Sequence, residues 1–343
     1  MAVVGSGRWP LLPLLVFAAV ALVCVLSPPP SPLSSSSVLQ SSVAAEADTT
    51  NKGGSNNNQQ PQQPSSRAAS NATAKERSPL VKLKAPIVVI GAELRIGTLL
   101  IIGLSEKGER VVAVSREQTT PDSMIIKMAY GVHYIHGDLN KPSTFQRYIK
   151  GAKAVIFACQ ARSVFNHDRE VVKFTGGDTP KTVEYRGIST VAKLAVKANV
   201  PKIMMISMYM VTQTKAPEYI WLNKFKRSMY WKRQAELELI RQCKNSNTSY
   251  TIVRAGGATG EKGFGLEKIV VRQGDYVRGS LPSEDLASIA VAALLTNSTQ
   301  NTVFEAITGE EDALASLEKL SPNDGSAREC PEEDAALAVQ REG

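Results

Sequence analysis

The feature that most constrains this chain is an alternation of short β-branched apolar runs with segments of helical periodicity, between residues 86 and 307. Apolar runs of this length, bounded by turn residues, are typical of buried strands. Strands are predicted at 86–91, 110–115, 132–136, 154–159, 202–208, 250–253 and 302–307. Helices are predicted at 96–104, 142–150, 182–198, 229–243 and 282–295.

Buried strands joined by helices indicate a mostly parallel sheet with helices on both faces, because each parallel connection has to cross over the sheet. We therefore predict an α/β fold with a doubly wound parallel sheet. In such a sheet a ligand binds beyond the carboxyl ends of the strands, where the strand order reverses. The region after residue 256 is short and polar, and we expect it to form a small C-terminal lid over a substrate or partner.

Composition divides the 343 residues into four zones. Residues 1–26 contain an apolar run that suits the core of a signal peptide, with a signal anchor as the alternative. Residues 27–80 hold 30 Ser, Pro, Asn or Gln in 54 positions and no aromatic residue, so we expect a disordered leader. We place the folded domain at 81–309 and an acidic, disordered tail at 310–343.

The formal net charge of +8 is unevenly distributed. Residues 81–309 contain 32 basic and 19 acidic residues and carry +13, whereas residues 310–343 contain three basic and ten acidic residues and carry −7. The basic part suits a nucleotide phosphate or an acidic protein partner, and an ordinary solvated surface is the alternative. Nothing indicates nucleic acid. Four cysteines exclude a disulfide scaffold, and His133 and His136 fall on opposite faces of a strand, so no metal site is expected.

The turn after the first predicted strand carries the clearest candidate site. Its sequence, residues 91–97, is Gly-Ala-Glu-Leu-Arg-Ile-Gly and leads into a helix. A dinucleotide site needs a tight glycine turn and a helix N-terminus whose amides face the pyrophosphate. The first and third glycine positions match, but Leu94 replaces the middle glycine and Glu93 adds a negative charge. We predict that the pyrophosphate is held by Gly91, Ala92, Arg95, Ile96 and Gly97.

Further cofactor contacts are predicted at the ends of the next strands. Arg116 follows the second strand, where an acidic residue would bind the ribose of NAD and a basic residue favours the 2′-phosphate of NADP. A surface arginine is the alternative. Asp138 and Leu139 follow the third strand and are expected at the adenine, and Cys159 ends the fourth strand beside the cofactor. We therefore predict NADP as the cofactor, with NAD less favoured.

Four sequence blocks, in this order, resemble those of an atypical short-chain dehydrogenase/reductase of the NmrA-like kind. They are residues 91–97, 136–139 (His-Gly-Asp-Leu), 151–158 and 231–236 (Trp-Lys-Arg-Gln-Ala-Glu). The resemblance covers about 85–308 and implies a Rossmann fold that binds NAD(P). The last block is similar to that of a plant and algal chloroplast branch, which implies a plastid protein.

The family's hydride-transfer residues are only partly present. Its Tyr-x-x-x-Lys motif places both side chains on one helix face, where the lysine binds the nicotinamide ribose and lowers the pKa of the tyrosine. The resemblance assigns that lysine to Lys232, but Ser228 stands four residues earlier. Tyr230 lies roughly 200° around the helix. Ser207, after the fifth strand, is the other catalytic candidate, and Tyr209 is an alternative to it.

This incomplete set predicts an NAD(P)-binding protein with little or no turnover, acting as a redox-responsive assembly or partner-binding factor in a plastid. The alternative is an NADPH-dependent oxidoreductase for a small carbonyl or quinone. The leader predicts delivery to the plastid through the endomembrane route, and the endoplasmic reticulum or secretory pathway is the alternative. Membrane contact is expected only through the leader, if it is not cleaved.

Overall fold

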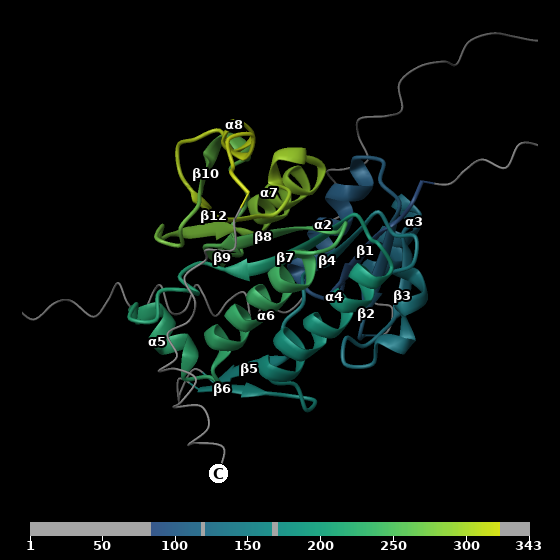
Figure 1. The fold of residues 1–343 in the computed structure, drawn as a ribbon, viewed down its shortest axis with the longest axis horizontal. Helices are drawn as coiled ribbons and strands as arrows, with labels where there is room; N and C mark the ends of the chain where they lie inside the picture. Colours follow the sequence, from purple (N-terminus) through teal and green to yellow (C-terminus); the bar gives the residue numbers. More distant parts are fainter. Residues whose placement is uncertain (1–83, 118–120, 167–170, 323–343) are drawn as a thin grey trace, which may run out of the picture. The chain divides into compact units, whose positions relative to one another are not determined.

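A computed structural model of the protein describes residues 84–117, 121–166 and 171–322. Its main feature is one eight-stranded sheet (Figure 1). The strands are β1 (Ile87–Ile90), β2 (Val111–Ser115), β3 (His133–His136), β4 (Ala154–Phe157), β7 (Lys202–Met208), β8 (Ser249–Ala255), β10 (Ile269–Arg272) and β12 (Thr302–Thr308). They lie in the order β10-β12-β8-β7-β4-β1-β2-β3, and every neighbouring pair except β10–β12 is parallel. The predicted α/β fold with a doubly wound parallel sheet is confirmed.

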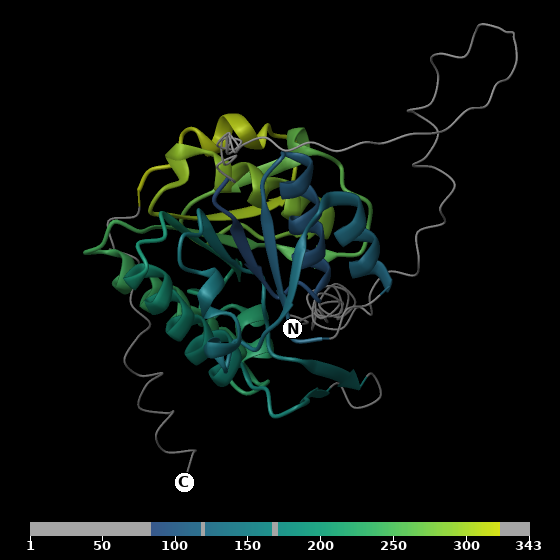
Figure 2. The ribbon, with the colours of Figure 1, turned by 90° about the vertical axis from the view of Figure 1, so that its right-hand side faces the viewer.

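Helices cover both faces of this sheet (Figures 1 and 2). The helices on one face are α2 (Arg95–Glu106), α3 (Pro121–Tyr130), α7 (Ser283–Leu295) and α8 (Ala313–Leu317), and those on the other are α4 (Ile188–Lys197) and α6 (Ser228–Cys243). Alternate residues of β1 pack against the two layers, Ile87 and Val89 on one side and Val88 and Ile90 on the other. The continuous apolar runs in the sequence follow from this two-sided burial.

Two predicted helices differ from the structure. Residues 142–150 form two short 3₁₀ helices, Pro142–Thr144 and Gln146–Tyr148, instead of one α-helix. Between them Phe145 has a φ of −137°, outside helical geometry, and its side chain is fully buried beside Gly137. The helix expected at 182–198 begins as a π-helix, Lys181–Gly187, and only then continues as α4. The other predicted strands and helices are present with boundaries shifted by a few residues.

Several elements were not predicted. They are α3, α5 (Pro217–Asn223), β10, α8, the hairpin of β5 (Ser163–Asn166) with β6 (Val171–Phe174), and the pair of β9 (Gly257–Thr259) with β11 (Ser280–Pro282). The region after residue 256, expected as a lid, supplies two strands of the main sheet and the core helix α7. The fold also continues past residue 309, because Ala313 and Leu317 of α8 are fully buried.

The two N-terminal zones predicted at 1–26 and 27–80 lie outside the described residues, as does the acidic tail beyond residue 322. Within the described part of the chain, no helix combines the length and the apolar character needed to cross a bilayer. In the same part, no group of three or more His, Cys, Asp or Glu side chains is arranged to hold a metal ion.

Candidate functional site

The candidate site lies at the carboxyl ends of β1, β2 and β4, where the strand order reverses. Gly91 ends β1 with a φ of +94°, and a Cβ there would lie 2.6 Å from the carbonyl oxygen of Ala158. A Cβ on Gly97 would lie 2.0 Å from the carbonyl oxygen of Gly91. Both positions therefore require glycine, and α2 packs directly on the turn. This is the close strand–helix approach that a dinucleotide turn uses.

The N-terminus of α2 offers donors for an anion. The helix begins at Arg95, Leu94 precedes it in extended conformation without a side-chain cap, and its first turn contains no acidic residue. The first amides of a helix lack partners within the helix, and the helix dipole favours negative charge there. The buried Nε of Arg95 also has no hydrogen-bond partner among the described residues. These donors fit the pyrophosphate of a dinucleotide.

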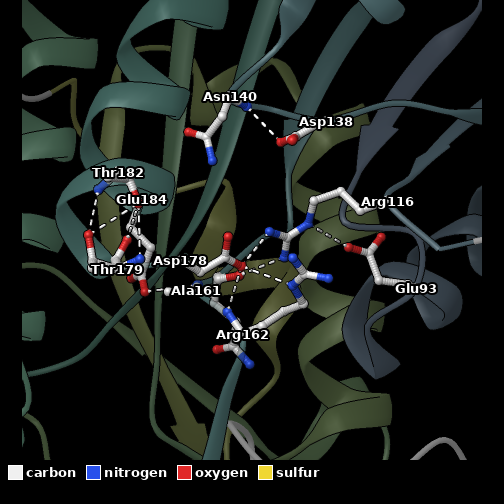
Figure 3. Close-up of polar contacts among 11 residues, drawn as sticks. Glu93, Arg116, Asp138, Asn140, Ala161, Arg162, Asp178, Thr179, Thr182 and Glu184 are labelled. Atoms are coloured by element: carbon white, nitrogen blue, oxygen red, sulfur yellow. Dashed lines mark hydrogen bonds and ion pairs between the residues drawn. The ribbon is translucent and has the colours of Figure 1, made fainter. Parts of the chain in front are cut away.

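Arg116, the residue predicted to select NADP, lies in a network of ion pairs (Figure 3). Its Nε is 3.3 Å from Oε1 of Glu93 and its Nη1 is 2.5 Å from Oδ2 of Asp178. Its Nη2 donates to the carbonyl oxygen of Gln160 at 3.2 Å. Burial favours the neutral form of Arg116, but the two carboxylates raise the pKa of the guanidinium above its usual value. Asp178 was not predicted as a partner of Arg116, because the two residues are 62 positions apart and no local pattern links them.

Little space remains at the turn. A cavity of about 10 Å³ is lined by Gly91, Glu93, Arg116, Leu139 and Cys159 among others, which is room for about one water molecule. A second cavity, of about 360 Å³, shares Leu139 and is also lined by residues of the π-helix and of α4. The carboxylate of Asp138, predicted at the adenine, instead accepts a hydrogen bond from the backbone N–H of Asn140 at 2.9 Å.

Cys159 lies where the sequence placed it, two residues after β4 and against the small cavity. Burial, together with the nearby carboxylate of Glu184, raises the pKa of its thiol to about 12. A thiol that stays protonated at neutral pH is a poor nucleophile. The residue therefore contributes packing to the site rather than redox chemistry.

Lys232 is brought to the site but is paired with a carboxylate. Its Nζ lies 2.6 Å from Oε2 of Glu184, and the two side chains are 14% and 5% exposed. Burial opposes the charge on Lys232, but Glu184 raises the pKa of the ammonium above its usual value. Ser228, at the position of the family tyrosine, is the first residue of α6. The ring of Tyr230 packs against Trp231 and under a guanidinium group.

The hydroxyl of Ser207 is also engaged. It donates to Oε1 of Glu236 at 2.5 Å, and Glu236 is fully buried. The same carboxylate accepts from Nε and Nη2 of Arg254 at 3.1 and 2.8 Å and from Nη1 of Arg233 at 3.0 Å. Tyr209, the alternative to Ser207, packs in a separate apolar cluster beside α5. Glu236 was not among the predicted site residues, although it ends the Trp-Lys-Arg-Gln-Ala-Glu block at 231–236.

The chain is similar to proteins that bind dinucleotides. The sequence model of the NAD(P)H-binding family matches residues 91–297. The uncharacterised sugar epimerase YhfK of Bacillus subtilis is 23% identical over 236 residues, 68% of this chain and 99% of that protein. The oxidoreductase ylbE of Lactococcus lactis has a TM-score of 0.53 at 23% identity, covering 68% of this chain and 96% of that one. A short-chain dehydrogenase/reductase of Veillonella parvula, in complex with NADP, has a TM-score of 0.50 at 15% identity, covering 65% and 94%. At these identities the two structures show a shared fold.

Proposed function

Because the chain belongs to the NAD(P)H-binding family, we propose that it binds NADP at the turn after β1, transfers hydride slowly or not at all, and acts as a redox-responsive partner-binding factor. The observation that carries this proposal is the ion pair between Lys232 and Glu184. In a Tyr-x-x-x-Lys enzyme the lysine ammonium lowers the pKa of the phenol that exchanges the proton. Here the carboxylate of Glu184 balances the positive charge of the Lys232 ammonium, and Ser228 stands at the position of the tyrosine.

Residues of this chain would receive the pyrophosphate, the 2′-phosphate and the nicotinamide ribose of the dinucleotide. The first amides of α2 and the side chain of Arg95 would hold the pyrophosphate. Arg116 would meet the 2′-phosphate and Lys232 the nicotinamide ribose. Bound NADPH would supply a hydride at its nicotinamide ring. The hydroxyl of Ser207 already donates its hydrogen to Glu236, so in this arrangement it does not offer that hydrogen to the carbonyl oxygen of a substrate.

The test compares cofactor binding with cofactor consumption by the full-length chain. We expect NADPH to bind saturably, and its absorbance to fall no faster than in protein-free buffer across a panel of carbonyl and quinone acceptors. Sustained consumption with any acceptor at about 1 s⁻¹ or faster, the lower end of typical enzyme rates, would refute the proposal of slow or absent hydride transfer. Failure to bind either NADPH or NADH would refute dinucleotide binding itself.

The alternative function is NADPH-dependent reduction of a small carbonyl or quinone. The position of Ser207 favours it, because the residue lies near the carboxyl end of β7, where the family that the sequence resembles usually carries a serine or threonine. This alternative predicts turnover that is lost in Ser207→Ala and retained in Ser163→Ala, a matched substitution on the β5–β6 hairpin. Equal rates in the two variants would contradict it.

We further propose delivery to a plastid. The apolar run within residues 1–26 and the Ser-rich, acid-poor composition of residues 27–80 support it. A fusion of residues 1–80 to a fluorescent protein should accumulate in plastids. Retention in the endoplasmic reticulum, or release to the medium, would contradict this proposal.

The charge of +13 over residues 81–309 supports an acidic protein as the partner.

A further inference from the structure

The side chain of Arg116 crosses the crevice in which the dinucleotide would lie. In the sheet, β1 lies between β4 and β2. Arg116 is the first residue after β2, yet its Nη2 donates a hydrogen bond to the carbonyl oxygen of Gln160, which lies three residues after β4. The guanidinium therefore passes over the end of β1 and the glycine turn. This crossing accounts for the small volume, about 10 Å³, that remains between Arg116 and Gly91.

Asp178 holds Arg116 in this position, and it does so from within a site built for an anion. One of its oxygens, Oδ2, accepts from Nη1 of Arg116 at 2.5 Å, from Nε of Arg162 at 3.1 Å and from the backbone N–H of Arg162 at 3.0 Å. The side chain of Asp178 is 5% exposed. In Figure 3, dashed lines run from both guanidinium groups to the carboxylate of Asp178. Two guanidinium groups and a backbone amide are the donors with which proteins recognise phosphate.

The carboxylate of Asp178 and the guanidinium of Arg116 are both charged at neutral pH. Burial alone would raise the pKa of Asp178, but the backbone N–H of Arg162 and the guanidinium of Arg116 hold it below its usual value. A carboxylate carries one negative charge, whereas a phosphate monoester carries close to two at neutral pH. A phosphate monoester can therefore replace every contact that Asp178 makes and add charge to it.

The backbone before Asp178 is conformationally permissive. Gly176 and Gly177 precede it with φ values of +63° and +76°. They follow β6 of the β5–β6 hairpin, which pairs with no strand of the main sheet. Glycine adopts left- and right-handed conformations with equal ease. The segment can therefore withdraw the carboxylate while the sheet stays intact.

We propose that Arg116 and Arg162 form a phosphate-binding site for which Asp178 is an internal competing ligand, and that NADP binds by displacing Asp178. This inference rests on the proposed function and adds two residues to it, Arg162 as a 2′-phosphate ligand and Asp178 as a determinant of cofactor selectivity. NAD also has to open the crevice, but its 2′-hydroxyl cannot replace the carboxylate. The apparent affinity for each cofactor equals its affinity for the open state multiplied by the fraction of the protein that is open.

The test titrates the full-length chain and two variants with NADPH and with NADH. Asp178→Asn should tighten the binding of both cofactors by about fivefold or more, because the closed state loses its charged ligand. Arg162→Ala should lower the preference for NADPH over NADH by about fivefold or more, because only NADPH loses a phosphate contact. Glu109→Gln is the matched control. It removes the ion pair between Glu109 and Lys153, which lies near the amino end of β2 and so away from the crevice. This variant should change the affinity for neither cofactor.

Unchanged affinities in Asp178→Asn, or an unchanged cofactor preference in Arg162→Ala, would overturn the inference while leaving dinucleotide binding intact. Absence of binding by wild type and all variants would instead refute the proposed function, and the inference with it. If Asp178→Asn does not fold, as judged by thermal unfolding, Asp178→Ser replaces it. That variant removes the same charge with a smaller side chain and should also tighten the binding of both cofactors.

Discussion

Replacing Gly97 with alanine tests how closely α2 packs on the glycine turn. The added Cβ would lie 2.0 Å from the carbonyl oxygen of Gly91, 2.8 Å from its carbonyl carbon and 3.1 Å from Cα of Ala92. All three atoms belong to the backbone, so no side-chain rotation can relieve the overlap, and the start of α2 has to move away from β1. Alanine in a helix usually gains about 1 kcal/mol over glycine. Overpacking of this kind costs ~1–3 kcal/mol or more.

Because the overlap is with backbone, we take the upper end of that cost, ~3 kcal/mol, less the gain of about 1 kcal/mol. We therefore expect Gly97→Ala to lower the free energy of unfolding by ~2 kcal/mol, measured by urea denaturation, with a fall in Tm of about 2–4 °C for each kcal/mol. NADPH affinity should fall by about tenfold, because the amides of the first turn move off the pyrophosphate. Gly103→Ala is the control within the same helix, since its Cβ would meet only the end of the Val291 side chain, at 3.3 Å. Equal stability and equal NADPH affinity in wild type and Gly97→Ala would refute the predicted packing.

Three further predictions concern buried ionisable groups. Glu236→Gln leaves the guanidinium groups of Arg233 and Arg254 without their shared carboxylate and should lower stability by ~3–5 kcal/mol in urea denaturation; a loss below ~1 kcal/mol would contradict this. Burial raises the pKa of Glu305 from 4.5 to about 7, so the folded state holds a proton that the unfolded state releases, and stability should fall as pH rises from about 5 to about 7. Glu305→Gln should therefore gain up to ~3 kcal/mol at pH 8 and nothing at pH 4, and an equal effect at both pH values would be inconsistent with that assignment. The pKa of about 12 at Cys159 predicts that iodoacetamide alkylates this thiol slowly in the folded chain, with the reaction monitored by mass spectrometry. Alkylation of Cys159 as fast as in the urea-unfolded chain would disprove this prediction.

The seven parallel strands of the main sheet could be predicted from sequence because their signals are local; β10, the antiparallel edge strand, was not predicted. A parallel strand buried on both faces is a continuous β-branched run, as Ile87–Ile90 and Val111–Ser115 are. The glycine turn is likewise local, since the spacing of Gly91 and Gly97 follows from the contact between a strand and the helix after it. The alternation of such runs along the chain was sufficient to predict the doubly wound order.

The parts that escaped prediction depend on contacts between distant residues or lack an inward apolar face. Asp178 meets Arg116 across 62 positions, and no local pattern marks it as a ligand. The helix α3 presents Met124, Ile125 and Met128 to solvent, at 54%, 65% and 84% exposure, so its sequence does not show the buried stripe of a surface helix. Glu184 lies in a π-helix, whose spacing differs from the 3.6-residue period used to predict which face a residue occupies.

The central claim is that this chain binds NADPH and transfers its hydride slowly or not at all, and a single-turnover measurement tests it most directly. Full-length protein in excess over NADPH is mixed with a quinone acceptor, so that nearly all of the cofactor is bound and even one slow turnover becomes visible. Energy transfer from tryptophan to the nicotinamide, with Trp231 next to Lys232, reports binding in the same sample. We predict that energy transfer appears while NADPH absorbance decays no faster than without protein. Decay of the bound NADPH at about 1 s⁻¹ or faster, the lower end of typical enzyme rates, would contradict the account.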